Sequence, residues 1–212
     1  TNGKTSTVFF LHQLLLHIGV KAGLSSSAFT QIDKHRVDSP LTTPEAPRLH
    51  HLLLEMADAD AKAAVVEVSA QALVRHRVDG LVFDVAGFTN LTRDHLDEFG
   101  TMENYLSAKA ALFTRKFSGR SVINVEDRFG EQMLELARAE SLEGSVGIGQ
   151  NQDYSFEVTA AGIKITGRQE LLLARDIGPL MSKNLVLGAV MLLEAGYSAK
   201  AVAAAALEME TL

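Results

Sequence analysis

A glycine, a lysine and a threonine stand side by side near the start of the chain, as Gly3, Lys4 and Thr5. Glycine lets backbone N–H groups approach phosphate oxygens, lysine reaches the β- and γ-phosphates, and a hydroxyl can bind Mg²⁺. An apolar-rich segment follows at once, so we expect a helix N-terminus, which favours anions, at this point. The pattern predicts a nucleotide phosphate site. The alternative is a chance match in which Thr5 or Ser6 only caps the helix.

Two further sets of polar residues lie inside or after apolar runs. Glu67 lies inside the valine-rich run AVVEVS, and a carboxylate in a buried strand is costly unless it is paired or binds a cation. Glu67 is therefore a candidate metal ligand, unless it occupies the exposed end of a strand. A second apolar run ends at Asn90, and Asp94, His95 and Asp97 follow it. Because open α/β sheets bind ligands at the carboxyl ends of their strands, His95 is a candidate for a metal or phosphate role, with an ordinary surface or core histidine as the alternative.

The composition limits the class of protein. The 212 residues are 47% hydrophobic and 22% charged, which is typical of one soluble domain with a sizeable core. The net charge of −6 provides no basic surface for nucleic acid or an anionic membrane. The absence of cysteine excludes disulfides and thiolate metal sites. No apolar run approaches the ~20 residues that a membrane span needs, and no signal peptide is visible, so we expect a soluble, cytoplasmic protein.

Alternation of strands and helices predicts the elements that position these groups. We expect helices over residues 5–18, 45–56, 101–117, 128–139, 182–194 and 198–208. We expect buried strands over 63–70, 80–90, 121–127 and 145–149, and loops over 25–47 and 92–101. Alternating residues around Ala161 and Gly162 predict an antiparallel hairpin, with another strand in 170–178. The fold class is thus α/β, with a mainly parallel sheet flanked by helices and a small antiparallel hairpin appendage.

Five stretches occur in an order and spacing that resemble the central, ATP-binding domain of the Mur ligases. They are TNGKTS, TTPE, VVEVSAQAL, VDGLVFDVAGFTNLTRDHLDEFGTMENYLSAKAALF and GPLMSKN. The resemblance covers nearly the whole chain and is closest to the MurE-type, tripeptide-forming members. It implies a P-loop NTPase-like domain over residues 1–212, with the UDP-binding N-terminal domain and the amino-acid-binding C-terminal domain absent. It also implies that this fragment of a cytoplasmic bacterial enzyme is inactive alone.

The resemblance implies an ATP-dependent ligase of peptidoglycan synthesis. Such an enzyme adds a diamino acid, meso-diaminopimelate or L-lysine, to UDP-N-acetylmuramoyl-L-alanyl-D-glutamate through an acyl phosphate. ATP and Mg²⁺ would be required, and charge neutralisation and positioning would matter more than acid–base catalysis. Two alternatives stay open: a relative of the folate polyglutamate ligases, and a non-catalytic Mur-like protein that binds nucleotide. The sequence does not indicate an oligomeric state.

The same resemblance assigns roles to residues. Catalytic roles would belong to Lys4, Glu67, His95 and Lys109. The metal ligands would be Thr5, Glu67, His95 and Lys109, the last as a carbamate. The nucleotide would contact Thr1, Asn2, Gly3, Lys4, Thr5, Ser6, Asn90 and Asn184. The muramoyl-peptide substrate would contact Thr42, Thr43, Ser69, Arg75 and Arg77.

The chain departs from the family pattern at three positions. Arg75 stands at a frequent glutamine, Leu41 at an asparagine before the threonine pair, and Met181 at the first asparagine of the motif that contains Asn184. Plainer roles are open for other residues of these motifs. Thr42 could be a turn residue, Asn184 could cap a helix N-terminus, and the lysine of YLSAKAALF could be a solvated helix residue.

Overall fold

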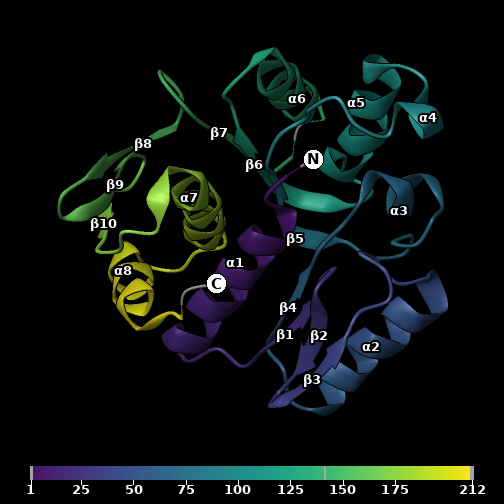
Figure 1. Cartoon of the computed structure of the whole chain (residues 1–212), viewed down its shortest axis with the longest axis horizontal. Coiled ribbons are helices and arrows are strands. Elements are labelled where there is room, and N and C mark those ends of the chain that lie inside the picture. The colour runs from purple at the N-terminus through teal and green to yellow at the C-terminus, as the bar shows by residue number, and fades with distance from the viewer. Residues whose placement is uncertain (1, 141, 211–212) are drawn as a thin grey trace.

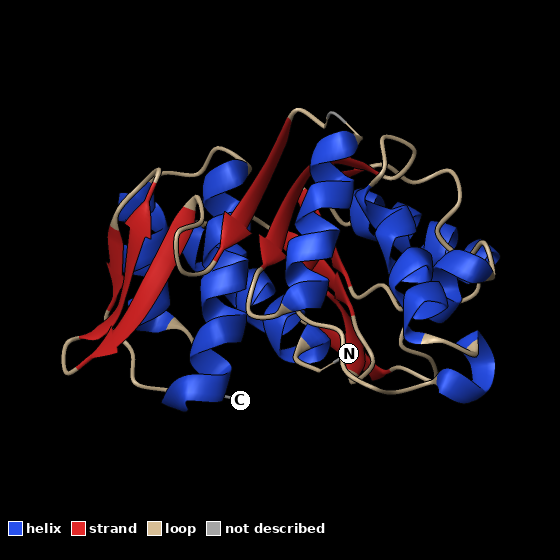
Figure 2. Ribbon diagram, turned by 90° about the horizontal axis from the view of Figure 1, so that it is seen from above, coloured by secondary structure: helices blue, strands red, loops and turns tan. Residues whose placement is uncertain are grey.

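The computed structural model describes residues 2–140 and 142–210. Helix α1 (Lys4–Ile18) runs through the centre of the molecule, and the strands form two separate sheets (Figure 1). Helices flank the strands on both sides when the molecule is seen from above (Figure 2). Gly19 ends α1 in the left-handed conformation, with φ of 93°, as its place after the apolar run predicts. The α/β class is confirmed.

The smaller sheet has the strand order β3-β2-β1-β4. Its strands are β1 (Ala22–Ser25), β2 (Phe29–Ile32), β3 (His35–Asp38) and β4 (Ala63–Val66). β1 and β4 are parallel, whereas β2 and β3 form an antiparallel extension. The prediction of a continuous loop over 25–47 is therefore wrong. All four residues of β3 are exposed, so this edge strand lacks the apolar alternation that reveals a strand in a sequence.

The larger sheet has the strand order β10-β9-β8-β7-β6-β5. Its strands are β5 (Phe83–Phe88), β6 (Ser118–Asn124), β7 (Gly144–Ile148), β8 (Tyr154–Thr159), β9 (Gly162–Gly167) and β10 (Leu171–Leu173). Neighbours from β5 to β8 are parallel, and β8, β9 and β10 are antiparallel. The parallel sheet and its antiparallel appendage are thus confirmed, including the hairpin turn at Ala161 and Gly162.

The remaining helices follow the predicted order, with four differences. They are α2 (Ala46–Asp58), α3 (Ala70–Val74), α4 (Leu96–Phe99), α5 (Met102–Ala110), the 3₁₀ turn η1 (Ala111–Phe113), α6 (Arg128–Ala139), α7 (Gly178–Glu194) and α8 (Ala199–Glu208). α3 was not predicted, α4 interrupts the predicted loop over 92–101, α5 ends before Phe117, and α7 begins four residues before Ser182. No helix in the described part of the chain is long and apolar enough to cross a membrane.

One apolar cluster holds the start of α1 in place. It contains Phe10 and Leu14 of α1, Leu24 of the smaller sheet, Val122 of the larger sheet and Val190 of α7. Leu14 and Val122 have no exposed surface. Because close-packed interiors have low compressibility, this cluster holds α1 in place relative to both sheets.

The strand that precedes Glu67 is less buried than its sequence predicts. Val65 is buried, but Val66 and Val68 are only half-buried. The expectation that all three valines lie in a strand covered on both faces is therefore wrong for two of them. The physical reason is that β4 lies at the edge of its sheet.

Candidate functional site

The predicted phosphate loop leads directly into α1. Gly3 precedes the helix with φ of 82° and ψ of −3°, and no side chain caps this helix end. The plain reading of Thr5 or Ser6 as a helix cap is therefore wrong. Asn2 is anchored by Asn90, whose Oδ1 accepts from the Asn2 N–H at 3.0 Å and whose Nδ2 donates to the Asn2 carbonyl at 2.9 Å.

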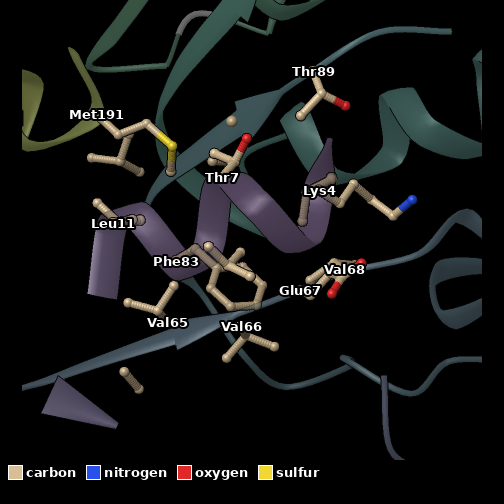
Figure 3. Close-up of a pocket in the computed structure, with 16 residues that line it drawn as sticks. Lys4, Thr7, Leu11, Val65, Val66, Glu67, Val68, Phe83, Thr89 and Met191 are labelled. Atoms are coloured by element: carbon tan, nitrogen blue, oxygen red, sulfur yellow. The ribbon is translucent and has the colours of Figure 1, made fainter. Parts of the chain in front are cut away.

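Of the predicted nucleotide contacts, Thr1 lies outside the described residues. Ser6 is half-buried in the first turn of α1. Lys4 lies beside Glu67 at one end of a cavity, and Leu11 and Met191 line its other end (Figure 3). Lys4 and Glu67 thus both line the cavity at the start of the helix.

Asn184 lies against the phosphate loop. A Cβ at Gly3 would come within 2.3 Å of the Asn184 Oδ1, so only glycine permits this close approach. Asn184 is 8% exposed and sits well inside α7, whose N-cap is Ile177. The alternative that Asn184 caps a helix is wrong, and its contact with a nucleotide stays a prediction.

Thr5, Ser27 and Glu67 form a cluster of oxygen atoms at the carboxyl ends of β1 and β4. The Thr5 Oγ1 donates to the Glu67 Oε1 at 3.1 Å and lies 2.7 Å from the Ser27 Oγ. The Ser27 N–H donates to the Glu67 Oε2 at 2.8 Å. Glu67 is 3% exposed, so the alternative of a solvent-exposed glutamate is wrong.

Two details of this cluster differ from the sequence prediction. β4 ends at Val66, so Glu67 follows the strand rather than lying inside it, although its N–H still donates to the Ser25 carbonyl at 2.8 Å. Ser27 was not predicted. Its signal is the apolar pair Gly23-Leu24 followed by three serines, a short strand that delivers hydroxyls to the same sheet edge.

The donor set suits a hard divalent cation. Mg²⁺ prefers carboxylate and hydroxyl oxygens, with substrate phosphates completing its shell. The Glu67 carboxylate accepts from an uncharged hydroxyl and an uncharged N–H, and a buried charge is stable when a counter-charge meets it. Among residues 2–140 and 142–210, no three His, Asp or Glu side chains form a group that could hold a metal.

Lys109 is buried near the start of α1. It is 8% exposed, so the alternative of a solvated helix lysine is wrong. Its Nζ lies 4.8 Å from the centroid of the Tyr105 ring. Burial, helped by the nearby Lys4 ammonium and opposed by the Asp94 carboxylate, lowers the pKa of Lys109 to about 7. A large share of its amine is consequently neutral and nucleophilic at neutral pH.

His95 also contacts Tyr105. Its ring meets the Tyr105 ring edge to face, with the centroids 6.0 Å apart, and its Nε2 lies 3.4 Å from the Asp94 Oδ2. The backbone of His95 is left-handed, with φ of 51°, where it precedes α4. Lys109 and His95, the two predicted ligands of a second metal, therefore both contact the ring of Tyr105.

Three of the predicted substrate residues are engaged within the protein. The Thr43 Oγ1 donates to the Glu67 carbonyl at 2.8 Å and accepts from the Ser69 N–H at 3.1 Å. The buried Arg77 donates to the Thr43 carbonyl at 3.1 Å and pairs with Glu45. These contacts fix the loop around Glu67, and the roles of Thr43, Ser69 and Arg77 toward a substrate stay predictions.

The other two predicted substrate residues lie nearer the surface. Arg75 is exposed and pairs with Glu98 at 2.9 Å, and Thr42 is half-buried. Arg75 directly follows α3 as its C-cap residue.

The family is decided by a comparison with known families. The family model described as "Mur ligase middle domain" matches residues 1–177. The chain belongs to the Mur ligase family. The matched range contains Lys4, Glu67, His95 and Lys109, the residues to which the resemblance assigns catalytic roles.

Curated relatives of this Mur ligase domain are MurE-type enzymes by name. The chain is 42% identical to a UDP-N-acetylmuramyl-tripeptide synthetase of Leifsonia xyli, with 97% of the chain and 41% of that protein covered. It is 38% identical to a UDP-N-acetylmuramoyl-L-alanyl-D-glutamate--2,6-diaminopimelate ligase of Corynebacterium glutamicum, covering 80% of the chain and 32% of that protein. The chain thus spans at most about two fifths of the length of these relatives.

Solved structures share the fold of the domain. A UDP-N-acetylmuramoyl-L-alanyl-D-glutamate--2,6-diaminopimelate ligase matches all of the chain with a TM-score of 0.86 at 24% identity, over 45% of its own length. A bifunctional folylpolyglutamate synthase/dihydrofolate synthase from Yersinia pestis, complexed with AMPPNP and a Mn ion, matches all of the chain with a TM-score of 0.74 at 20% identity, over 56% of its length. At these identities the likeness shows the fold.

Proposed function

We propose that residues 1–212 form the ATP-binding catalytic domain of a MurE-type ligase. The reaction is the ATP-dependent addition of a diamino acid to UDP-N-acetylmuramoyl-L-alanyl-D-glutamate in peptidoglycan synthesis. The names of the bacterial relatives support this substrate class, and they support a place in the bacterial cytoplasm where nucleotide-linked precursors and ATP meet. The remaining domains of the parent protein would bind the uridine nucleotide and the incoming amino acid.

One observation carries the proposal. The Thr5 hydroxyl and the buried Glu67 carboxylate are 3.1 Å apart, directly beside Gly3 and Lys4 at the start of α1. A helix N-terminus, a lysine and a hard-cation ligand set at one point are the parts that hold a magnesium triphosphate. Mg²⁺, when bound, would neutralise negative charge on the phosphates.

The chemistry consists of two steps. A substrate carboxylate oxygen attacks the γ-phosphorus of ATP, the bond from phosphorus to the β,γ-bridging oxygen breaks, and ADP leaves with that oxygen. The resulting acyl phosphate is attacked at its carbonyl carbon by the amine of the diamino acid. The tetrahedral adduct loses phosphate, the nitrogen loses its proton, and an amide remains.

This chain's residues position and neutralise rather than transfer protons. Lys4 and the backbone N–H groups after Gly3 would hold the phosphates, while Asn90 fixes the loop through Asn2 and Asn184 closes on Gly3. Preorganised positive groups that face developing charge are the main source of catalysis in phosphoryl transfer.

Lys109 would act as a carbamate. Its neutral amine attacks CO₂, a C–N bond forms, and a proton leaves to water, so a buried cation becomes an anion. The lowered pKa of Lys109, about 7, supports this step because only the neutral amine is nucleophilic. The carbamate and His95, which both contact the Tyr105 ring, would then hold a second Mg²⁺.

The test is an assay of the full-length parent protein with ATP, Mg²⁺, UDP-N-acetylmuramoyl-L-alanyl-D-glutamate and either meso-diaminopimelate or L-lysine. Phosphate release is expected to require the acceptor and one of the two diamino acids. His95→Ala should lower kcat by about a hundredfold or more, the usual loss when one transition-state-stabilising group is removed. His51→Ala, on the exposed surface of α2, should leave kcat unchanged.

Two results would overturn this proposal. Phosphate release stimulated by a folate substrate, and not by the muramoyl dipeptide, would favour a folate polyglutamate ligase. Nucleotide binding without phosphate release under any of these conditions would favour a non-catalytic nucleotide-binding protein.

A further inference from the structure

The aromatic ring of Tyr105 contacts both side chains to which the proposed function assigns a second Mg²⁺. The Lys109 Nζ lies over this ring, 4.8 Å from its centroid. The His95 ring meets it edge to face, with the centroids 6.0 Å apart and the planes at 84°. The place of each of these side chains therefore depends on where the Tyr105 ring is held.

The core of the domain fixes the Tyr105 ring. Tyr105 is 2% exposed, and it belongs to an apolar cluster that contains Phe88 of β5, Ile123 of β6 and Met133 of α6. Because protein interiors are close-packed, a ring in such a cluster has little room to move. Tyr105 thus sets the positions of the two side chains relative to the larger sheet.

The lysine reaches the ring from the next turn of the same helix. Lys109 follows Tyr105 by four residues in α5, and residues four apart lie on the same face of a helix. The lysine stem is long and flexible, so ordering it costs conformational entropy. A ring that already restricts this stem reduces the entropy cost that remains when the lysine binds an ion.

The histidine depends on the same ring in a second way. His95 directly precedes α4, whose four residues are all exposed or half-buried, so the apolar core does little to hold this helix. Phe99 of α4 stacks on the Tyr105 ring, with the centroids 4.7 Å apart and the planes at 18°, and α4 lies beside α5 (Figure 1). Glu98 also pairs with Arg75 at 2.9 Å, but exposed ion pairs contribute little.

We propose that Tyr105 is a positioning residue for the second metal, because its ring holds Lys109 and His95 where both can reach one ion. This inference rests on the proposed function, in which the Lys109 carbamate and His95 bind that ion. The face of the ring has no lone pair to offer, so Tyr105 orders the two ligands without competing for the metal. Removal of groups that orient metal ligands typically weakens metal binding by about 10- to 100-fold.

The test is the binding of Mn²⁺, as a substitute for Mg²⁺, to the full-length parent protein. Equilibrium dialysis in buffer that contains CO₂ and a saturating non-hydrolysable ATP analogue gives the number of bound ions and the affinity for each. We expect the wild type to bind two ions. In Tyr105→Leu the second ion should bind about 10- to 100-fold more weakly, while the ion at Thr5 and Glu67 keeps its affinity.

Two further variants separate positioning from packing. Tyr105→Phe keeps the ring and should keep the affinity for the second ion. Phe113 is also 2% exposed and belongs to the same apolar cluster, where its ring contacts Phe88. Phe113→Leu should therefore weaken the packing and still bind both ions as the wild type does. A loss of the second ion in Tyr105→Phe, or an equal loss in Phe113→Leu, would overturn the proposal.

If Tyr105→Leu fails to fold, NMR of the wild type labelled with ¹³C-lysine decides. The ε-methylene group of Lys109 neighbours the Nζ that lies over the ring, so its proton signal should lie upfield of that of the exposed Lys200. We expect this shift both without ligands and with Mg²⁺ and the ATP analogue bound. Its loss on binding would show that Lys109 leaves the ring to reach the metal, and the proposal would be wrong.

The dialysis also distinguishes this proposal from the proposed function. Equal affinity for the second ion in the wild type and in Tyr105→Leu would overturn the role of Tyr105 and leave the proposed function standing. A wild type that binds one ion only would overturn the second metal site itself, and the role of Tyr105 with it.

Discussion

At the scale of single residues, burial decides the chemistry of Lys109. The ordinary pKa of a lysine is 10.5, and that of Lys109 is lowered to about 7, chiefly by burial. Between these two values the unfolded chain binds more protons than the folded chain. The free energy of unfolding therefore rises with pH across this window, and the full cost of the buried ammonium is present below about pH 7.

Lys109→Met is expected to stabilise the domain at low pH. Methionine keeps an apolar stem without a charge, so the variant should gain a free energy of unfolding on the order of a few kcal/mol at about pH 6, and the gain should shrink as the pH approaches about 10. Urea unfolding in CO₂-free buffer measures this. Lys200→Met, at an exposed position of α8, is the control and should show little effect at any pH. A gain for Lys109→Met that does not vary with pH would contradict the lowered pKa.

The sequence revealed those site residues whose charge conflicts with their surroundings. Glu67 among valines is a costly position that needs an explanation, and it is buried in the structure. Lys109 is buried as well, but only the resemblance to the family motif indicated it. Ser27 was missed because a serine in a polar stretch is ordinary. Its importance arises from a contact across forty residues, with Glu67, that no local pattern reports.

At the scale of elements, the geometry before α1 depends on one glycine. Gly3 has φ of 82°, a region that costs other residues about 1–2 kcal/mol, and the Asn184 side chain occupies the space where a Cβ would lie. The turn before α1 and the side chain of Asn184 in α7 are thereby fitted to each other.

Gly3→Ala should destabilise the domain more than Gly196→Ala. Both glycines have positive φ, but a Cβ at Gly196 meets nothing within 4 Å, whereas one at Gly3 clashes with Asn184. We expect a loss of about 1 kcal/mol for Gly196→Ala and of about 2–4 kcal/mol for Gly3→Ala, where overpacking adds to the backbone strain. Urea unfolding of the two variants measures the difference, and equal losses would contradict the close approach of Asn184.

Elements with a strong apolar period were predicted well, and elements without one were not. α6 has the predicted bounds, Arg128–Ala139, because its apolar face repeats at helical spacing. β2 and β3 were assigned to a loop. β2 pairs with β1 and β3 pairs with β2, and neither strand is stabilised by burial of a regular apolar face.

At the scale of the whole molecule, α1 connects the two sheets through one core. Leu14, with no exposed surface, belongs to the cluster that includes Leu24 of the smaller sheet and Val122 of the larger sheet. A loss of packing at α1 should therefore weaken both sheets, even though β4 and β5 are not paired with each other.

Leu14→Ala should lower the free energy of unfolding by about 2–5 kcal/mol, as for other fully buried leucines. Native-state hydrogen exchange should report the same loss at Leu24 and at Val122, because the two sheets share this core. Leu54→Ala, at an exposed position of α2, should cost less than about 0.5 kcal/mol. A loss confined to one sheet would show that the sheets unfold independently.

The architecture was predictable at this scale because parallel strands need helical crossovers, which the alternating sequence pattern displays. The separation into two sheets was not predictable. It depends on whether β4 and β5 pair with each other, and their apolar sequences are compatible with either arrangement.

The central claim is that Thr5 and Glu67 hold the metal of a magnesium nucleotide beside Lys4. The most direct measurement is the affinity of the parent protein for a non-hydrolysable ATP analogue, titrated with and without Mg²⁺, in the wild type, Glu67→Gln and the exposed α6 control Glu135→Gln. We predict that Mg²⁺ strengthens binding at least tenfold in the wild type and in Glu135→Gln, and that this gain is lost in Glu67→Gln. An equal gain from Mg²⁺ in Glu67→Gln would contradict the assignment of the metal to this carboxylate.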